Sequence, residues 1–229
     1  MPNVNAPLKV GIIDSGISPA SKSHLLAGCC VNWQDDRIVL TNASVLDKMG
    51  HGAALTDILC ASSLSLKLLV AKVFFDRLLC APEQIAAALD WQVMQGARLI
   101  NMSFGLRTDR PVLEDACARA VAAGVMLVAA SPARGESVYP ASYPGVIRAT
   151  GDARCQPGDI SYLNSAQADF GGFVRSEHGQ IAGASVGCAY VTRAIAHILC
   201  EQPETPCSDV LKALIAQSKY CGIERKVSS

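Results

Sequence analysis

The sequence has few aromatic residues, few charges and no excess of charge of either sign. Aromatic residues make up 5% of the 229 positions and charged residues 17%, against a charged share of about 25% in ordinary soluble domains. Twenty basic and twenty acidic residues leave a formal net charge of zero. Because no overall field would attract a polyanion, we expect neither a nucleic-acid partner nor binding to a membrane surface.

Long apolar runs are also missing. The uncharged stretch at residues 120–133 falls short of the roughly 18 apolar residues that suggest a membrane span. The first ten residues contain neither a basic region nor an apolar one, so no secretory signal is expected. These absences predict a cytoplasmic protein.

Cysteine is plentiful, with ten residues, but a disulfide framework is not expected in a chain that stays in a reducing compartment. No two cysteines have the Cys-x-x-Cys spacing, and the adjacent Cys29 and Cys30 cannot easily bind one metal ion. We therefore interpret the cysteines as small core residues and predict no metal site.

Apolar segments alternate with segments of helical spacing along the chain. Buried strands are expected at residues 9–14, 66–75, 98–103 and 125–130, and helices at 51–61, 82–96, 111–123, 183–200 and 209–218. Residues between the first strand and the first helix are predicted as irregular, and 139–147 as turns around an extended segment. This alternation indicates a mostly parallel sheet with helices on both faces. Because no repeat or linker divides the chain, residues 1–229 are predicted as a single domain.

Three polar residues stand where catalytic groups collect in such sheets, at strand ends and helix starts. Asp14 ends the first strand, while His51 and Ser185 each open a helix. An acid, an imidazole and a hydroxyl are the parts of an acyl-transfer triad, in which the histidine is the base and the acid orients it. Each residue alone is commonplace, since Asp-Ser-Gly is usually a turn and Gly-x-Ser usually a helix cap. The order acid, histidine, serine is more informative, because unrelated serine hydrolases use other orders.

Several segments in the same order resemble the subtilisin-like serine proteases, or subtilases. They are KVGIIDSGI (9–17), MGHGA (49–53), LINMSFG (99–105), GVMLVAA (124–130), YPASYPGVI (139–147) and GASVGCAYV (183–191). The resemblance extends over about residues 8–200. It implies a three-layer subtilisin-like α/β fold and a serine endopeptidase whose triad is Asp14, His51 and Ser185, with no cofactor.

The resemblance also implies how a peptide or protein substrate would bind. The extended Ser103, Phe104 and Gly105 would pair with the substrate main chain as an added strand. The segment from Ala129 to Gly135, which includes Ala130, would form the facing wall of the pocket for the residue before the scissile bond. Phe104 is equally compatible with a core position, because successive strand residues point to opposite faces.

One element of the family pattern is missing. Subtilases normally supply a side-chain amide to the oxyanion hole from an Ala-Gly-Asn sequence, and an ungapped match puts Ala133 in the place of that asparagine. Ser131, Arg134 and Asn164 are candidate replacements, although each would also suit an ordinary loop. A slow enzyme and a protein without catalytic activity remain open as alternatives.

The helix that begins near Ser185 also departs from the pattern. Val186 replaces a methionine, Gly187 an alanine and Ala189 a proline. These changes concern packing behind the serine and leave its hydroxyl in place. Cys188 is interpreted as a buried small residue and not as a nucleophile.

Size and the predicted compartment suggest limited proteolysis of one client, such as removal of a leader peptide from a modified precursor peptide. On the same grounds, the chain is compared with the small intracellular subtilases of peptide-modification pathways. This subgroup includes the maturation protease for quinohemoprotein amine dehydrogenase. The alternatives are a catalytically weak or inactive pseudoprotease that binds and escorts a peptide, and a protease of broad intracellular turnover.

Overall fold

The computed structural model describes residues 6–61, 63–176, 179 and 181–224. Its strands are β1 (Leu8–Asp14), β2 (Leu25–Gln34), β3 (Arg37–Thr41), β4 (Leu66–Lys72), β5 (Leu99–Met102), β6 (Met126–Ala130), β7 (Val146–Gly151), β8 (Ile160–Tyr162), β9 (Phe170–Gly172) and β10 (Tyr220–Cys221). Its helices are α1 (His51–Cys60), α2 (Pro82–Met94), α3 (Pro111–Ala122), α4 (Ala184–Glu201) and α5 (Cys207–Gln217), with a short 3-10 helix η1 (Ala20–His24).

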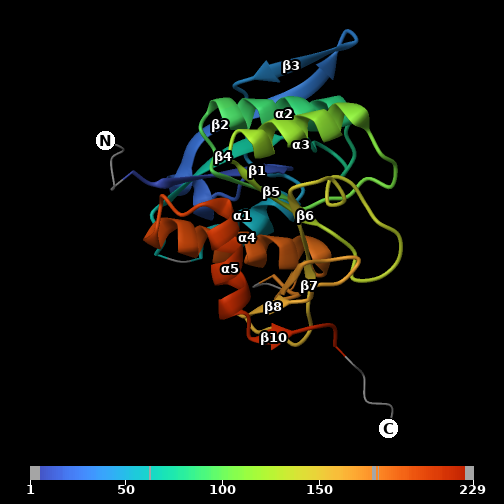
Figure 1. Ribbon diagram of the computed structural model, residues 1–229. Helices are drawn as coiled ribbons and strands as arrows, with labels where there is room; N and C mark the ends of the chain where they lie inside the picture. The colour runs from blue at the N-terminus through green and yellow to red at the C-terminus, as the bar shows by residue number, and fades with distance from the viewer. Residues whose placement is uncertain (1–5, 62, 177–178, 180, 225–229) are drawn as a thin grey trace.

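The strands form one sheet in the order β10-β8-β9-β7-β6-β5-β1-β4-β2-β3. Neighbouring strands are parallel except in the pairs β2–β3 and β8–β9. Figure 1 shows α2 and α3 on one face of the sheet and α1, α4 and α5 on the other. The predicted three-layer α/β architecture with a mostly parallel sheet is confirmed.

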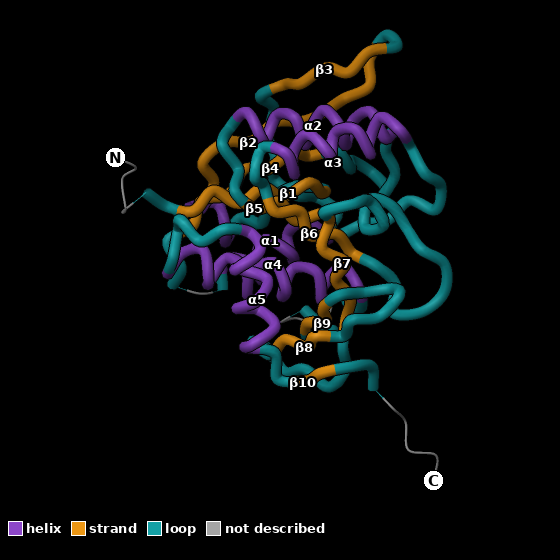
Figure 2. The backbone as a smooth tube through the Cα atoms, in the orientation of Figure 1, coloured by secondary structure: helices purple, strands orange, loops and turns teal. Residues whose placement is uncertain are grey.

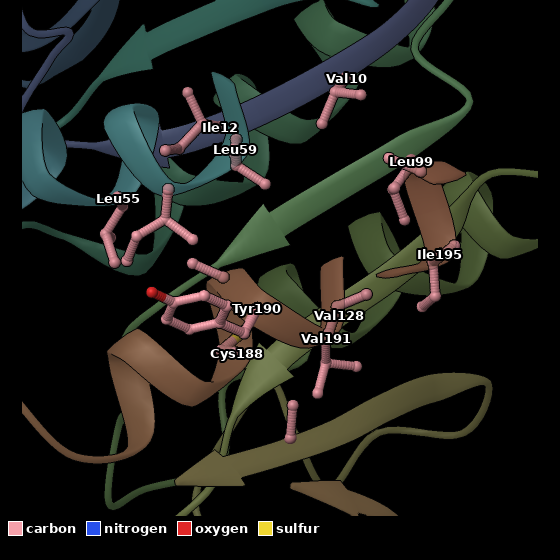
Figure 3. Close-up of a cluster of buried hydrophobic side chains, with 14 of the residues drawn as sticks. Val10, Ile12, Leu55, Leu59, Leu99, Val128, Cys188, Tyr190, Val191 and Ile195 are labelled. Carbon is pink, nitrogen blue, oxygen red and sulfur yellow. The ribbon is translucent and has the colours of Figure 1, made fainter. Parts of the chain in front are cut away.

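Side chains alternate between two cores, one on each face of the sheet. Val10 and Ile12 of β1 point toward the layer of α1, α4 and α5, whereas Ile13 points toward α2 and α3. This period of two is what a strand buried on both sides requires. Figure 3 shows the first core, in which Cys188, Tyr190 and other α4 residues lie among side chains of the central strands.

Helix α4 lies unusually close to the sheet. A Cβ atom added at Gly187 would collide with the main-chain oxygen of Thr150 in β7 and lie 2.6 Å from the nitrogen of Gly151. Glycine therefore stands at a helix position where the family pattern has alanine, because no side-chain atom fits between this turn of α4 and β7.

The segment predicted as irregular contains a β-hairpin, so that prediction was wrong. Strands β2 and β3 are joined by Asp35 and Asp36, with φ of 48° and 57°. Two left-handed residues form the tight turn that matches the twist of a hairpin, and aspartate tolerates this conformation better than most residues. The tube in Figure 2 shows this hairpin extending past α2 at one edge of the molecule.

The second half of the chain also contains strands that the sequence did not reveal. The short strands β8, β9 and β10 complete one side of the sheet. Strands of two or three residues are too short for a periodic pattern of apolar side chains, which is why the apolar spacing did not indicate them. In the described residues, no helix is both long and apolar enough to cross a membrane.

Candidate active site

Asp14 is a fully buried carboxylate at the carboxyl end of β1. Its Oδ1 accepts hydrogen bonds from the Ser15 main-chain nitrogen at 2.7 Å and from His51 Nδ1 at 2.8 Å. Ser15 Oγ donates to the same oxygen at 3.1 Å and accepts from the Gly52 main-chain nitrogen at 2.8 Å. Ser15 thus ties the end of β1 to the first turn of α1, while Asp14 Oδ2 has no partner among the described residues.

His51 opens α1, and its side chain is 14% exposed. A carboxylate can only accept hydrogen bonds, so the contact with Asp14 assigns the proton to Nδ1 and leaves Nε2 as the proton acceptor. Gly50 precedes the helix with φ of 90°. That left-handed conformation favours glycine and turns the chain from the preceding loop into α1.

Asp47 is an acidic neighbour of His51 that the sequence analysis did not single out. Its two carboxylate oxygens accept the main-chain N–H groups of Met49 and Ala53, each at 2.8 Å. Burial lowers the pKa of His51, but the hydrogen bond that its Nδ1 donates to Asp14 and the negative charges of Asp14 and Asp47 outweigh this effect, so the pKa lies above its ordinary value of 6.5. In the sequence, the acidic residue four positions before His51 is the feature that could have indicated this neighbour.

Ser185 lies in the first turn of α4 at the same edge of the sheet. Its hydroxyl donates to the Ser103 main-chain oxygen at 2.7 Å, and the Ser103 hydroxyl donates to the Ser185 main-chain oxygen at 2.9 Å. The β1–β5 register pairs Ile12 with Asn101, which puts Asp14 level with Ser103 on the neighbouring strand. Within the described chain, no hydrogen bond joins Ser185 to His51.

A buried chain of hydrogen bonds supports this end of α4. Thr192 Oγ1 lies 2.9 Å from Asn101 Oδ1, and Asn101 Nδ2 donates to Ser103 Oγ at 2.9 Å. Thr192 and Asn101 are fully buried. Because Ser103 in turn holds the Ser185 carbonyl, the chain sets the first turn of α4 relative to β5.

The candidate oxyanion donors differ in whether their hydrogen-bond donors are already engaged within the protein. The Ser131 hydroxyl donates to the Gln167 carbonyl at 2.6 Å and its main-chain N–H to Ala149 at 2.8 Å, so Ser131 has no free donor. Ala133 is exposed and offers no side-chain donor. The side chains of Arg134 and Asn164 donate no hydrogen bond to the described part of the chain.

The candidate substrate-binding residues divide into buried and accessible ones. Ser103 and Ala130 are buried, whereas Phe104 is half-buried and Gly105 is exposed. The Phe104 ring packs edge-on against Phe74 at 5.7 Å. The accessible main chain of this segment is therefore limited to the region around Gly105.

All ten cysteines are free thiols. Burial raises the pKa of the Cys188 thiol to about 12, so it is not available as a thiolate near neutral pH. In the residues that the structure describes, no group of three or more histidine, cysteine or acidic side chains is arranged to hold a metal ion.

Comparisons with known proteins point to one family. The family model described as the subtilase family matches residues 6–227. The minor extracellular protease Epr of Bacillus subtilis (strain 168) is 28% identical over 61% of this chain, and subtilisin BL of Lederbergia lenta is 29% identical over 59%. The matched regions span only 22% and 52% of those two relatives.

Solved structures show the same fold. S41 psychrophilic protease and sphericase each superpose with a TM-score of 0.68 and cover 95% of this chain and 86% of their own length. Their sequence identities to this chain are 16% and 18%, so these two likenesses concern the fold alone.

Proposed function

Because the chain belongs to the subtilase family of serine proteases, we propose that it cleaves peptide bonds with Asp14, His51 and Ser185 as its catalytic triad. The observation that carries this proposal is the 2.8 Å bond from His51 Nδ1 to the buried Asp14. It orients the imidazole and assigns its proton as a general base requires.

In the proposed reaction, the Ser185 hydroxyl rotates from the Ser103 carbonyl toward His51 Nε2. The imidazole takes its proton while Oγ attacks the carbonyl carbon of the substrate, and Asp14 stabilises the resulting imidazolium. The imidazolium then protonates the leaving amine as the peptide bond breaks. Water hydrolyses the acyl-enzyme by the same proton transfers, which restores the free serine.

The oxyanion of the tetrahedral intermediate needs hydrogen-bond donors. The Ser185 main-chain N–H lies in the first turn of α4, where such groups have no intrahelical acceptor and the helix dipole favours negative charge. Arg134 and Asn164 are the candidates for the second donor. A site with one donor fewer is expected to be slow.

A slow protease suits limited cleavage better than general degradation. We therefore propose that the substrate is a specific peptide or protein client, with leader-peptide removal from a modified precursor as the favoured case, in the cytoplasm. Ala133 and the bond that holds the Ser185 hydroxyl to Ser103 favour a second candidate, a pseudoprotease that binds and escorts a peptide.

A fluorophosphonate probe tests catalytic competence, because it reacts with a serine whose hydroxyl is activated. We expect the probe to modify Ser185, as located by mass spectrometry of the digested protein. His51→Ala should abolish the modification, and His197→Ala, at an exposed histidine on α4, should leave it unchanged. Absence of labelling at Ser185 in the folded protein would support the escort instead.

A further inference from the structure

A lysine is buried at the edge of the sheet that carries the proposed catalytic residues. Lys72 is the last residue of β4 and is only 5% exposed. The strand registers place it beside Asp14 of β1 and beside Cys30 of β2. Because a lysine is rarely buried so fully unless its charged end is bound, the contacts of its ammonium indicate what Lys72 does.

The Lys72 ammonium contacts a main-chain carbonyl and an aromatic ring. Its Nζ donates a hydrogen bond to the Leu46 carbonyl oxygen at 2.9 Å and lies 5.7 Å from the centre of the Phe75 ring. In the part of the chain that the structure describes, Lys72 forms no ion pair, although Asp14 lies on the neighbouring strand. The cation is therefore bound to the loop that precedes α1 and not to a carboxylate.

Lys72 points to the face of the sheet that α1 covers. Leu68 and Val70, on the same strand, belong to the core on that face, and the strand period of two continues from them to Lys72. The ammonium therefore lies on the same side of the sheet as α1, the helix that His51 opens.

The loop segment that Lys72 binds is fixed on its other side by Ile17. The Ile17 N–H donates to the Val45 carbonyl, and the Asp47 N–H donates to the Ile17 carbonyl, each at 2.9 Å. These two bonds form a parallel bridge between Ile17 and Leu46. In such a bridge the main-chain groups of Leu46 itself point away from Ile17, toward the side on which Lys72 binds. The main chain immediately before Asp47 is thus held from both sides.

Asp47 connects this loop to α1. Its carboxylate oxygens accept the main-chain N–H groups of Met49 and Ala53, each at 2.8 Å, which ties the loop to the first turn of the helix. A short series of contacts therefore leads from the Lys72 ammonium, through the loop and Asp47, to the turn that carries His51.

We propose that Lys72 is a positioning residue for His51, which holds the loop before α1 so that the Asp47 carboxylate stays close to the imidazole, an assignment that rests on the proposed function. Among the described residues, the charged groups that raise the pKa of His51 are Asp14 and Asp47. Lys72 is not among the groups that affect this pKa. Removal of Lys72 should therefore change the pKa of His51 only through the position of Asp47.

The effect on His51 can be measured without catalysis, by NMR titration of the histidine rings. The His51 resonance is assigned by its loss in His51→Ala. Lys72→Met keeps the length of the side chain but removes the donor. We expect it to move the titration midpoint of His51 down by about 0.5 on the pH scale, because the negative charge of Asp47 then acts from farther away.

The matched control is Lys67→Met. Lys67, near the other end of β4, also donates to a main-chain carbonyl, that of Ser23 at 2.9 Å. Its loss should leave the His51 midpoint at the value of the parent protein, whereas an equal displacement in both variants would contradict a specific role of Lys72.

Catalysis provides a separate readout with a fluorogenic peptide. Because the buried Lys72 does not reach a bound peptide, Lys72→Met should lower kcat about tenfold and leave KM unchanged. A folded parent protein that cleaves no peptide would contradict the proposed function, while a displaced His51 midpoint in Lys72→Met would still support the positioning by Lys72.

A double variant tests the route through Asp47. In the Asp47→Asn protein, Lys72→Met should displace the His51 midpoint no further. The same displacement with and without Asp47, or an unchanged midpoint in folded Lys72→Met, would overturn the proposal. So would a movement to higher pH, which is the result of losing a nearby positive charge. If Lys72→Met does not fold, Lys72→Gln, whose polar end is one atom shorter, replaces it with the same expected displacement.

Discussion

At the scale of single residues, the hydrogen bond of the Ser185 hydroxyl bears on the proposed reaction. In the structure the hydroxyl donates to the Ser103 carbonyl, while His51 Nε2 is left as a proton acceptor by the Asp14 contact. The proposed reaction requires a change of the Ser185 rotamer that directs the hydroxyl to this nitrogen.

Ala133 provides the first prediction. In subtilisin, a member of the same family, loss of the corresponding amide donor lowers kcat by roughly 10²–10³-fold. We expect Ala133→Asn to raise kcat by up to about 100-fold with little change in KM, measured with a fluorogenic peptide. The control is Ala153→Asn, because Ala153 and Ala133 line the same cavity. An unchanged kcat in Ala133→Asn would indicate that another group already supplies the donor.

Asp47 provides a prediction about pH. The base must be neutral to accept the serine proton, so kcat/KM falls as the pH drops through the pKa of His51, which lies above 6.5. Because the charge of Asp47 contributes to raising this pKa, Asp47→Asn should move the acidic limb of the pH profile to lower pH.

The control for this measurement is Asp57→Asn. Asp57 lies on α1, the helix that His51 opens. Its carboxylate accepts hydrogen bonds from the hydroxyls of Ser18 and Ser21, and it is not among the groups that raise the pKa of His51. An equal displacement of the profile in both variants would contradict a specific effect of Asp47.

At the scale of elements, the contact of α4 with β7 explains one departure from the family pattern. Alanine normally favours a helix over glycine by about 1 kcal/mol, but at Gly187 the added methyl group would overlap the Thr150 carbonyl. We expect Gly187→Ala to lower the free energy of unfolding by about 1–3 kcal/mol, measured by urea denaturation. A gain in stability would show that α4 can move away from the sheet at little cost.

The elements also differ in how well the sequence predicted them. Helices α2 and α3 begin at a proline, and glycine residues 96 and 124 follow their ends closely, so local signals marked both. The β2–β3 hairpin was missed because its two-aspartate turn resembles a polar loop. Strand β10 pairs with β8, about sixty residues earlier in the chain, and such pairing leaves no local pattern.

At the scale of the whole molecule, the order of strands in the sheet places Asp14 beside Ser103, the residue that Ser185 contacts. The neighbouring strands β1 and β5 carry Asp14 and Ser103 at their carboxyl ends, and α1 packs against α4 on one face of the sheet. Contacts between Asp14 and His51, 37 positions apart, and between Ser103 and Ser185, 82 apart, follow from this order.

Local apolar spacing, proline and glycine positions and six family-like segments were enough to determine the layers, most helices, the central strands and the three candidate catalytic residues. These sequence features depend only on residues that lie near one another in the chain. Tertiary structure alone decided that the Ser185 hydroxyl bonds to Ser103 and that Ser131 has no free donor. Each of these depends on the distance between side chains from separate elements, which only the packing of those elements determines.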